Sequence, residues 1–284
     1  MELEIDSVIN KLIETALQED IGSGDVTTEA IVPNSSMSNA FLNAREDLVL
    51  CGLNIAQAVF KKLDSSICIE PLHYDGEKIG AGETIATIKG WTKPILTGER
   101  VALNFLQRLS GVATLTNIYV EKIKGTNAKI LDTRKTTPGL RKLEKYAVRC
   151  GGGHNHRIGL YDQILVKDNH IAALKDEKPN PIAAAVKRAR EKYPSLIVEI
   201  EADNLNQVHQ AIKAGADIVL LDNMKINQIK EAVAIGKGKV KLEVSGGVNF
   251  NSIREIAEAG VDFISVGALT HSARAVDIAL DFSD

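Results

Sequence analysis

The chain has 284 residues, of which 44% are hydrophobic and 25% are charged, and its formal net charge is -3. This composition predicts an ordinary globular protein of one or two domains and argues against a disordered chain. The slight negative charge excludes a general electrostatic attraction to nucleic acid or to an anionic membrane surface, because both require an excess of Lys and Arg.

The N-terminal segment begins with acidic residues and lacks the basic start and apolar run of a signal peptide. No segment approaches the roughly 20 apolar residues that span a bilayer. We therefore expect a cytoplasmic protein that has neither membrane nor nucleic acid as a partner. Within residues 5–17 apolar side chains recur at helical spacing, which predicts an amphipathic helix, and residues 19–33 are expected to break it.

The three cysteines, Cys51, Cys68 and Cys150, are far apart in the sequence and odd in number. Such spacing indicates neither a disulfide framework nor a zinc site. Because free cysteine is among the most often buried residues, we predict three buried free thiols.

Residues 40–90 have the pattern of a small α+β module. Short apolar or alternating runs at 40–44 and 48–50 precede a helical pattern at 55–63. Glycines then punctuate short β stretches over residues 68–90, a pattern also found in the hammerhead sheets of lipoyl and biotinyl domains. No lysine lies at a hairpin tip in the sequence that cofactor attachment uses, so plain sheet structure is predicted.

A long helix over residues 94–124, with Gly111 inside it, is predicted to link this module to a second domain. Six apolar strands follow, each ending in polar residues, and helical patterns separate the later ones. Their spacing of about one strand-helix unit implies parallel strands with right-handed crossovers. Six strands are fewer than the eight of a closed barrel, so the fold class is α/β, with an open, incomplete β/α barrel. The six segments are KILDTRK, QILVKDNH, IVEIEAD, DIVLLDN, KLEVSGG and FISVGAL.

The carboxyl ends of parallel barrel strands meet at one mouth, where barrel enzymes carry their chemistry. In this chain the stretch 132–170 also holds eight basic and four acidic residues. The sequence therefore predicts a site for a small, multiply charged anion. The residues expected to converge there are Arg134, Lys135, Lys167, Glu201, Asp222, Ser245, Gly246, Gly247 and Gly267.

Two carboxylates, Glu201 and Asp222, follow adjacent predicted strands. They are the minimal protein ligands for a Mg²⁺ ion that keeps several waters and reaches substrate phosphates. A second interpretation is that they form ion pairs with Arg134 or Lys167, and the two interpretations are compatible.

Glycines at 245–247 and 265–272 follow the last two strands, where barrels commonly bind phosphate through backbone N–H groups. Tight turns without a ligand are the alternative for these glycines.

A group of cations, here called the cationic wall, is expected on the other side of the mouth. Arginine can grip a carboxylate with two parallel hydrogen bonds, whereas lysine acts as a movable point charge, so the mixture suggests more than one anionic group. A metal site through His154 and His156 is disfavoured, because no cysteine or carboxylate completes a ligand set nearby in the sequence. The wall consists of Arg134, Lys135, His156, Arg157 and Lys167.

Several long motifs closely resemble the quinolinate phosphoribosyltransferase family of type II phosphoribosyltransferases. The resemblance covers nearly the whole chain, including EDIGSGDVTT near its start and TGERVALNFLQRLSGVAT before the barrel, and the site positions show no departure from the family pattern. The motifs are DTRKTTPGLR, EKYAVRCGGGHNHRIGLYDQILVKDNH, VEIEADNL, ADIVLLDNM, EVSGGVN and VDFISVGALTHS.

The resemblance implies two domains and a homodimer. An N-terminal α+β sandwich of residues 1–110, joined by a returning segment 273–284, would precede a catalytic barrel of residues 111–272. Quinolinate would be bound by the cationic wall together with Arg100 from the other subunit. The resemblance assigns catalysis to Lys135, Lys167, Glu201 and Asp222, magnesium and ribose to Glu201 and Asp222, and the phosphoribosyl phosphate to Ser245, Gly246, Gly247, Gly267 and His271.

The implied reaction converts quinolinate and phosphoribosyl pyrophosphate to nicotinate mononucleotide, pyrophosphate and CO₂ in de novo NAD biosynthesis. Three alternatives stay open. One is a related phosphoribosyltransferase for another aromatic carboxylate, although so many cations favour a dianion. Another is a Schiff-base lyase that uses Lys167, which ends a barrel strand. The third is a non-enzymatic anion-binding protein, against which the Glu201 and Asp222 pair argues.

Overall fold

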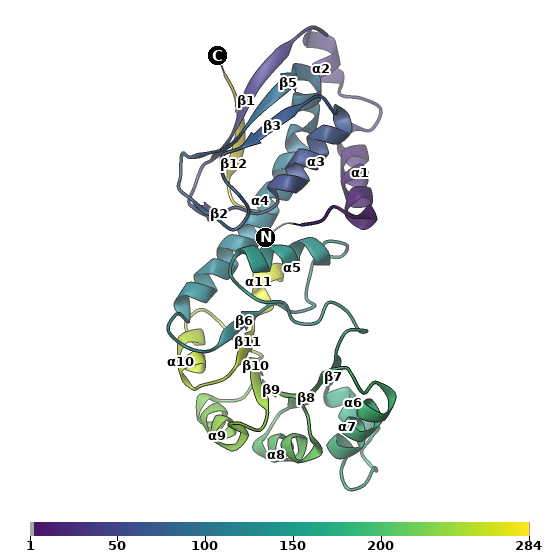
Figure 1. The fold of residues 1–284 in the computed structure, drawn as a ribbon, viewed down its shortest axis with the longest axis vertical. Helices are drawn as coiled ribbons and strands as arrows, with labels where there is room; N and C mark the ends of the chain where they lie inside the picture. Colours follow the sequence, from purple (N-terminus) through teal and green to yellow (C-terminus); the bar gives the residue numbers. More distant parts are fainter. Residues whose placement is uncertain (1–2, 284) are drawn as a thin grey trace. The chain divides into compact units, whose positions relative to one another are not determined.

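The computed structural model describes residues 3–283, which form two compact units (Figure 1). The sandwich unit comprises the chain up to Asn117, residues 137–152 and the residues from Ser272 onward. The barrel unit comprises residues 118–136 and 153–271.

A four-stranded antiparallel sheet forms the centre of the sandwich unit. Its strands are ordered β12 (Ile278–Phe282), β1 (Met37–Ala44), β5 (Thr84–Trp91) and β3 (Cys68–Pro71), and a separate pair is formed by β2 (Leu48–Val49) and β4 (Lys78–Ile79). Every second residue near the end of β1, including Ala40, Leu42 and Ala44, is buried, as expected of a strand with one face toward a core. β12 follows the whole barrel in the sequence and pairs with β1 along five residues.

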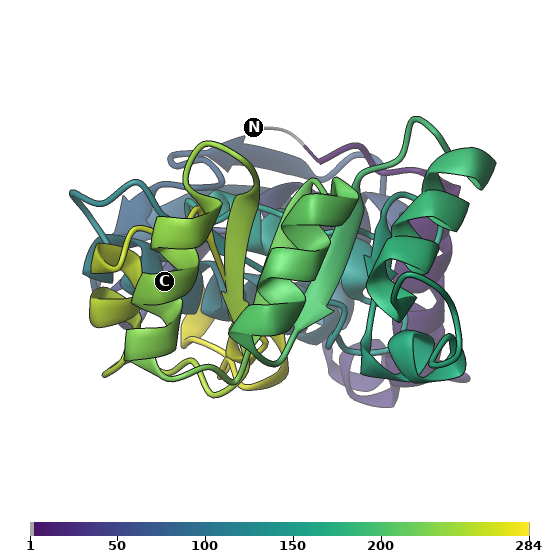
Figure 2. The same ribbon diagram turned by 90° about the horizontal axis from the view of Figure 1, so that it is seen from below.

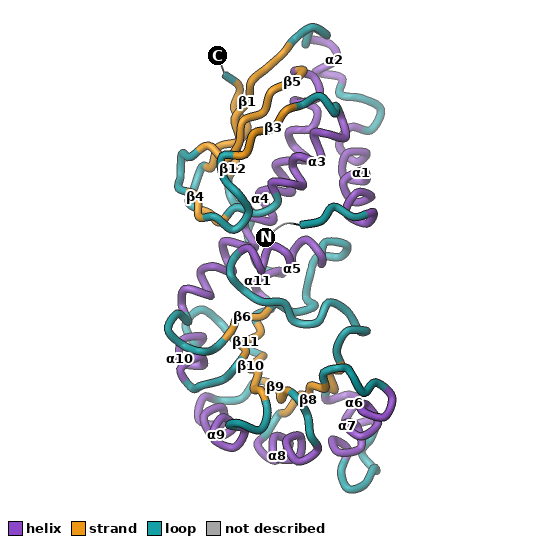
Figure 3. The backbone as a smooth tube through the Cα atoms, viewed as in Figure 1, coloured by secondary structure: helices purple, strands orange, loops and turns teal. Residues whose placement is uncertain are grey.

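Five helices accompany this sheet, and α1 and α3 lie side by side (Figure 3). The predicted first helix is confirmed, with Ile9, Ile13 and Leu17 buried. The segment 19–33, expected only as a break, contains the short helix α2, because the Asp25 side chain caps it by accepting a hydrogen bond from the Thr28 N–H. The helices are α1 (Ser7–Ile21), α2 (Val26–Ile31), α3 (Leu53–Leu63), α4 (Thr92–Lys122) and α5 (Arg141–Cys150).

Helix α5 was not predicted, because charged residues hide its apolar stripe of Leu143, Tyr146, Ala147 and Cys150. It also buries Glu144 completely. The carboxylate of Glu144 accepts hydrogen bonds from the Arg108 guanidinium at 2.6 Å and from the Thr137 hydroxyl at 2.8 Å. These contacts tie residues 137–152 to α4 in the sandwich unit, whereas the expected boundaries placed them with the barrel.

The barrel unit contains one sheet of six parallel strands that follow an arc (Figure 1). Within residues 3–283 its two outermost strands, β6 and β7, do not pair with each other, so the predicted open β/α barrel is confirmed. The sheet order is β6 (Lys129–Leu131), β11 (Phe263–Ser265), β10 (Lys241–Ser245), β9 (Ile218–Asp222), β8 (Val198–Ala202) and β7 (Ile164–Val166).

Helices cover the outer side of this arc (Figures 1 and 2). Those that connect successive strands have the 3.6-residue periodicity seen in the sequence, and α8 begins and ends at the expected residues. These outer helices are α6 (Asp168–Ala173), α7 (Pro181–Lys192), α8 (Leu205–Ala214), α9 (Ile226–Gly236) and α10 (Ile253–Glu258), and the short α11 (Ala268–His271) follows the last barrel strand, β11.

Between residues 3 and 283 the chain has no helix that combines the length and apolar character needed to cross a membrane. The three cysteines are free thiols. Cys51 and Cys150 are buried as predicted, but the prediction was wrong for Cys68, which lies exposed on β3.

Gly111 lies where α4 packs against the returning segment before β12. A Cβ atom at this position would lie 2.0 Å from the backbone carbonyl oxygen of Arg274 and 3.1 Å from its carbonyl carbon. A glycine in the middle of this long helix is therefore required by the close approach of two backbone segments.

We predict that Gly111→Ala destabilises the protein, although alanine is the better helix former by about 1 kcal/mol. The methyl group would meet backbone atoms that cannot rotate away, which should cost about 2 kcal/mol or more of unfolding free energy. Urea denaturation measures this. Gly98→Ala on the same helix is the control and should cost less, because its Cβ would meet side-chain atoms of Leu63 and Phe60 and no backbone atom among its three nearest neighbours. A Gly111→Ala protein as stable as the parent would contradict the packing argument.

Candidate active site

A cavity of about 790 Å³ lies at the carboxyl ends of the barrel strands. Its size suits one or two small-molecule substrates. Arg100, by contrast, is an exposed residue of α4 in the sandwich unit and does not line it. The predicted residues that the fold brings together here are Arg134, Lys135, His156, Arg157, Lys167, Glu201, Asp222, Ser245, Gly246, Gly247, Gly267 and His271.

The alternation of side chains along each strand builds the floor of this cavity. We call the polar residues at the strand ends the rim of the cavity. Residues two apart on a strand point to the same side of the sheet, so the residue two positions before each rim residue also faces inward and belongs to the floor. Glu243 and Ser265, which the sequence analysis missed, could have been found by this period of two. The floor and rim residues pair as Leu165 with Lys167, Leu220 with Asp222, Glu243 with Ser245, and Ser265 with Gly267.

The glycine-rich segment after α5 runs beside the free edge of β6. His154 forms a parallel bridge with Leu131, and its N–H donates to the Ile130 carbonyl at 2.8 Å. Two residues later the N–H of His156 donates to the buried carboxylate of Asp132 at 2.9 Å. This pairing brings His156 and Arg157 to the cavity from a segment that follows α5.

Polar contacts at both ring nitrogens hold the His156 ring in one orientation. Its Nδ1 accepts a hydrogen bond from the N–H of Arg157 at 2.7 Å, so the ring proton is assigned to Nε2. Nε2 lies 3.1 Å from a carboxylate oxygen of Glu199 and 3.6 Å from one of Glu243. His156 therefore contributes a ring of fixed orientation in this arrangement.

Two fully buried carboxylates, Glu199 and Glu243, lie beneath the cavity. Glu199 accepts from the Gln163 amide at 2.7 Å, and Glu243 accepts from the Ser265 hydroxyl at 2.6 Å. The sequence showed no carboxylate close to His156, but the fold supplies two, and the ligand atoms of these three residues all lie within 4.8 Å of one another. His154 is not part of that group.

Burial raises the pKa of Glu243 to about 8, and the neighbouring Glu199 carboxylate adds to the increase. At neutral pH the Glu243 side chain therefore holds a proton. The floor below the cationic wall thus has less negative charge than two ionised glutamates would give.

The guanidinium groups of Arg134 and Arg157 lie close enough to repel each other. Burial lowers the pKa of Arg157, and the positive charge of Arg134 lowers it further. The Arg157 guanidinium also donates to the Gln163 carbonyl at 3.1 Å, which fixes its position. A bound anion between the two arginines would relieve their repulsion.

Glu201 and Asp222 extend from the adjacent strands β8 and β9. The Lys167 ammonium lies 3.1 Å from the Glu201 carboxylate, so the predicted ion pair is confirmed for Glu201. Asp222 instead accepts from the Asn223 amide at 2.7 Å. Both carboxylates line the cavity, and two oxygen ligands of this kind fit a Mg²⁺ ion that takes its other ligands from water and substrate phosphates.

Glycine is required in the turn after β10. Gly246 and Gly247 have φ angles of 81° and 62°, in the left-handed region, and a Cβ at Gly246 would lie 2.4 Å from the side-chain oxygen of Asn223. After β11, a Cβ at Gly267 would lie 3.1 Å from the His271 ring and 3.2 Å from the Lys135 side chain. Both glycine turns line the cavity, the first beside the Asn223 amide and the second beside the His271 ring and the Lys135 side chain.

Comparison with known proteins assigns the chain to a family. The model of the quinolinate phosphoribosyl transferase N-terminal domain matches residues 25–110, and that of the C-terminal domain matches residues 112–281. The chain belongs to the quinolinate phosphoribosyl transferase family. The resemblance inferred from the motifs is thereby confirmed, and the chain is an enzyme of the phosphoribosyltransferase class.

Relatives match over nearly their full length. A probable nicotinate-nucleotide pyrophosphorylase [carboxylating] of Bacillus subtilis is 41% identical over 96% of this chain and 93% of its own. The corresponding protein of Mycobacterium leprae is 40% identical over 95% of both chains. The solved structure of the nicotinate-nucleotide pyrophosphorylase from Francisella tularensis is 46% identical, with a TM-score of 0.93 over 99% of this chain and 98% of that one.

The family membership and the ion pair both weigh against a Schiff-base lyase. The Lys167 side chain is paired with the Glu201 carboxylate, and such a partner favours the charged amine over the neutral amine that attacks a carbonyl carbon.

We predict that Glu243 makes the protein less stable as pH rises from about 4.5 to about 8. In this window folded Glu243 keeps a proton that the unfolded chain releases, so the unfolded state binds fewer protons and the unfolding free energy falls with pH. Glu243→Gln should flatten this part of the pH dependence in urea denaturation between pH 5 and 8.5. The exposed Glu231→Gln should leave the slope unchanged. A Glu243→Gln slope equal to that of the parent would show that Glu243 is ionised in the folded protein.

Proposed function

We propose that the cavity of the barrel unit binds quinolinate and phosphoribosyl pyrophosphate and converts them to nicotinate mononucleotide, pyrophosphate and CO₂, a step of de novo NAD biosynthesis. One observation carries the proposal. In a chain of this family, a cationic wall, two carboxylates and two glycine turns face the same cavity.

Quinolinate is a dianion, and the wall offers it guanidinium forks and ammonium groups. We assign its two carboxylates to Arg134, Arg157, Lys135 and Lys167, because these guanidinium and ammonium side chains line the cavity. His156 lines the same side, but its ring nitrogens already meet the Arg157 N–H and the Glu199 carboxylate. We therefore propose that His156 supports quinolinate binding by filling one side of the cavity with its ring and by holding the backbone of Arg157 in place.

The glycine turns suit the phosphate of the phosphoribosyl group. Backbone N–H groups of Ser245, Gly246, Gly247 and Gly267 would bind its oxygens, with His271 beside them. Glu201 and Asp222 would hold Mg²⁺ and the ribose hydroxyls. When bound, the ion would neutralise charge on the departing pyrophosphate.

The reaction needs no strong base, because the quinolinate nitrogen has a free electron pair. It attacks C1 of the ribose while the bond to pyrophosphate breaks, and positive charge develops on the ribose ring. Glu201 and Asp222 stabilise this charge, while the wall holds the nitrogen in line with C1. The new pyridinium then stabilises the electron pair left at ring C2 when CO₂ departs, and Lys135 or another wall cation donates the proton that completes the product.

Arg100 fits this scheme as a residue of a second subunit. It is exposed on α4 and lies outside the cavity that its own barrel unit forms. We propose a cytoplasmic homodimer in which each Arg100 reaches the quinolinate site of its partner.

Purified protein mixed with quinolinate, phosphoribosyl pyrophosphate and Mg²⁺ should release CO₂ and form nicotinate mononucleotide in equal amounts. A parallel reaction with nicotinate in place of quinolinate separates the rival substrate. Nucleotide formed from nicotinate alone, with no CO₂ from quinolinate, would overturn the assignment in favour of a monocarboxylate.

We predict that Arg134→Lys lowers kcat/KM for quinolinate by about 10- to 150-fold, because the loss of a charge-assisted, bidentate contact costs on the order of 1.5 to 3 kcal/mol. Steady-state kinetics with varied quinolinate measure this. Arg188→Lys is the matched control, since Arg188 lies on α7 in a surface ion pair with Glu177. Parent-like kinetics in Arg134→Lys would remove Arg134 from the quinolinate site.

A further inference from the structure

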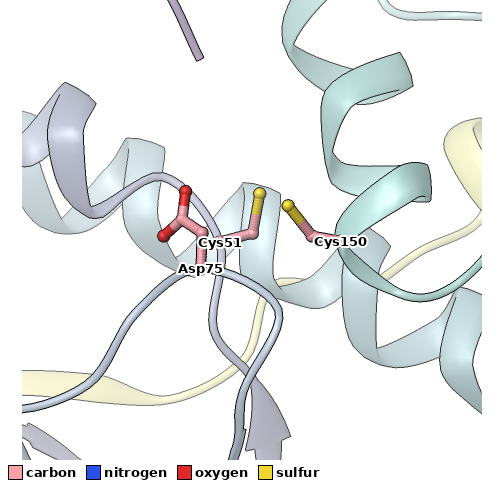
Figure 4. Close-up of side chains that lie close together, drawn as sticks. All are labelled: Cys51, Asp75 and Cys150. Atoms are coloured by element: carbon pink, nitrogen blue, oxygen red, sulfur yellow. The ribbon is translucent and has the colours of Figure 1, made fainter. Parts of the chain in front are cut away.

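Two cysteines that are 99 positions apart in the sequence meet inside the sandwich unit. Cys51 lies between β2 and α3, and Cys150 is the last residue of α5. Their sulfur atoms and a carboxylate oxygen of Asp75 lie within 4.8 Å of one another, and the Cys150 sulfur is turned toward that of Cys51 (Figure 4). Both are free thiols, with relative exposures of 0% and 9%.

Asp75 is already engaged with other groups. Its carboxylate accepts from the N–H groups of Gly52 and Leu53 at 2.9 and 3.1 Å, and from the Tyr146 hydroxyl at 2.9 Å. It therefore anchors the first turn of α3 and holds α5 beside it. The two sulfurs are hydrogen-bonded to each other, and Cys150 also to Tyr146, whereas two soft ligands alone are fewer than the four of a structural zinc site.

The two thiols are chemically unequal. The hydrogen bond from Cys51 lowers the pKa of Cys150, whereas burial raises the pKa of Cys51. Cys150 is also the more exposed of the two. Because the thiolate is the reactive form, Cys150 is suited to react first and Cys51 to react second.

We propose that Cys51 and Cys150 are a reversible oxidation site, at which a peroxide produces an intramolecular disulfide. The Cys150 sulfur attacks one peroxide oxygen, the O–O bond breaks, and a sulfenic acid and one water are formed. The Cys51 sulfur then attacks the Cys150 sulfur, the S–O bond breaks, and a second water leaves with the Cys51 proton. Two thiols are oxidised to one disulfide, and one hydrogen peroxide is reduced to two waters.

The bond would have a definite mechanical effect. It would join the turn before α3 to the end of α5 and close a loop of about 100 residues in the unfolded chain, which favours the folded state. The residues directly after Cys150 are the glycines that lead to His156 and Arg157, so oxidation would tether the start of that segment.

The test uses the full chain and needs no measurement of enzyme activity, so its outcome is independent of the proposed reaction. The protein is treated with a small excess of hydrogen peroxide, denatured, and its free thiols are counted. Two of three thiols should be lost, a peptide pair joining Cys51 to Cys150 should be found by mass spectrometry, and dithiothreitol should restore both thiols. The melting temperature of the oxidised protein should rise by several degrees.

Variants separate the pair from the third cysteine. Cys68→Ser should form the same cross-link, because Cys68 is exposed on β3 and takes no part. Cys51→Ser should accumulate a sulfenic acid at Cys150 that dimedone labels, and Cys150→Ser should form no intramolecular cross-link. If Cys51 and Cys150 stay reduced while Cys68 is oxidised, or if the cross-link found includes Cys68, the proposal is wrong.

Discussion

The site depends on one geometric constraint, the alternation of side chains along parallel strands. Because all six strands run in the same direction, their last inward-facing residues meet at one edge, and the inward-facing residues two positions earlier form a second layer below it. Rim and floor are thus set by the same register. If the pairing register of any strand shifted by one residue, its rim and floor side chains would face outward, and their sequence neighbours would face the cavity instead.

The two layers differ in charge and in burial. The rim carries cations, the buried Glu201 and the half-buried Asp222, whereas the floor contains Glu199 and Glu243 with almost no access to water. Two ionised carboxylates would be costly in such a place, and the raised pKa of Glu243 removes one of the charges. The floor can therefore orient His156 by hydrogen bonding without cancelling the positive charge of the wall above it.

The sequence predicted the six strands and the rim well, because apolar runs and the polar residues that end them are local signals. It did not predict α5, whose buried Glu144 is satisfied by Arg108 from another helix, nor the cluster of His156 with Glu199 and Glu243. The meeting of Cys51 and Cys150 was missed for the same reason. Each of these depends on contacts between residues far apart in the chain, and spacing along the sequence carries no information about such contacts.

The return of β12 to the first sheet also affects the order in which the protein can be completed. Residues 278–282 pair with β1 and follow the entire barrel in the chain. During synthesis the sandwich sheet lacks an outer strand until every barrel strand has been made. The sandwich unit, whose first residues are translated earliest, therefore completes its sheet last. Until then the edge of β1 is free to pair with strands of other chains.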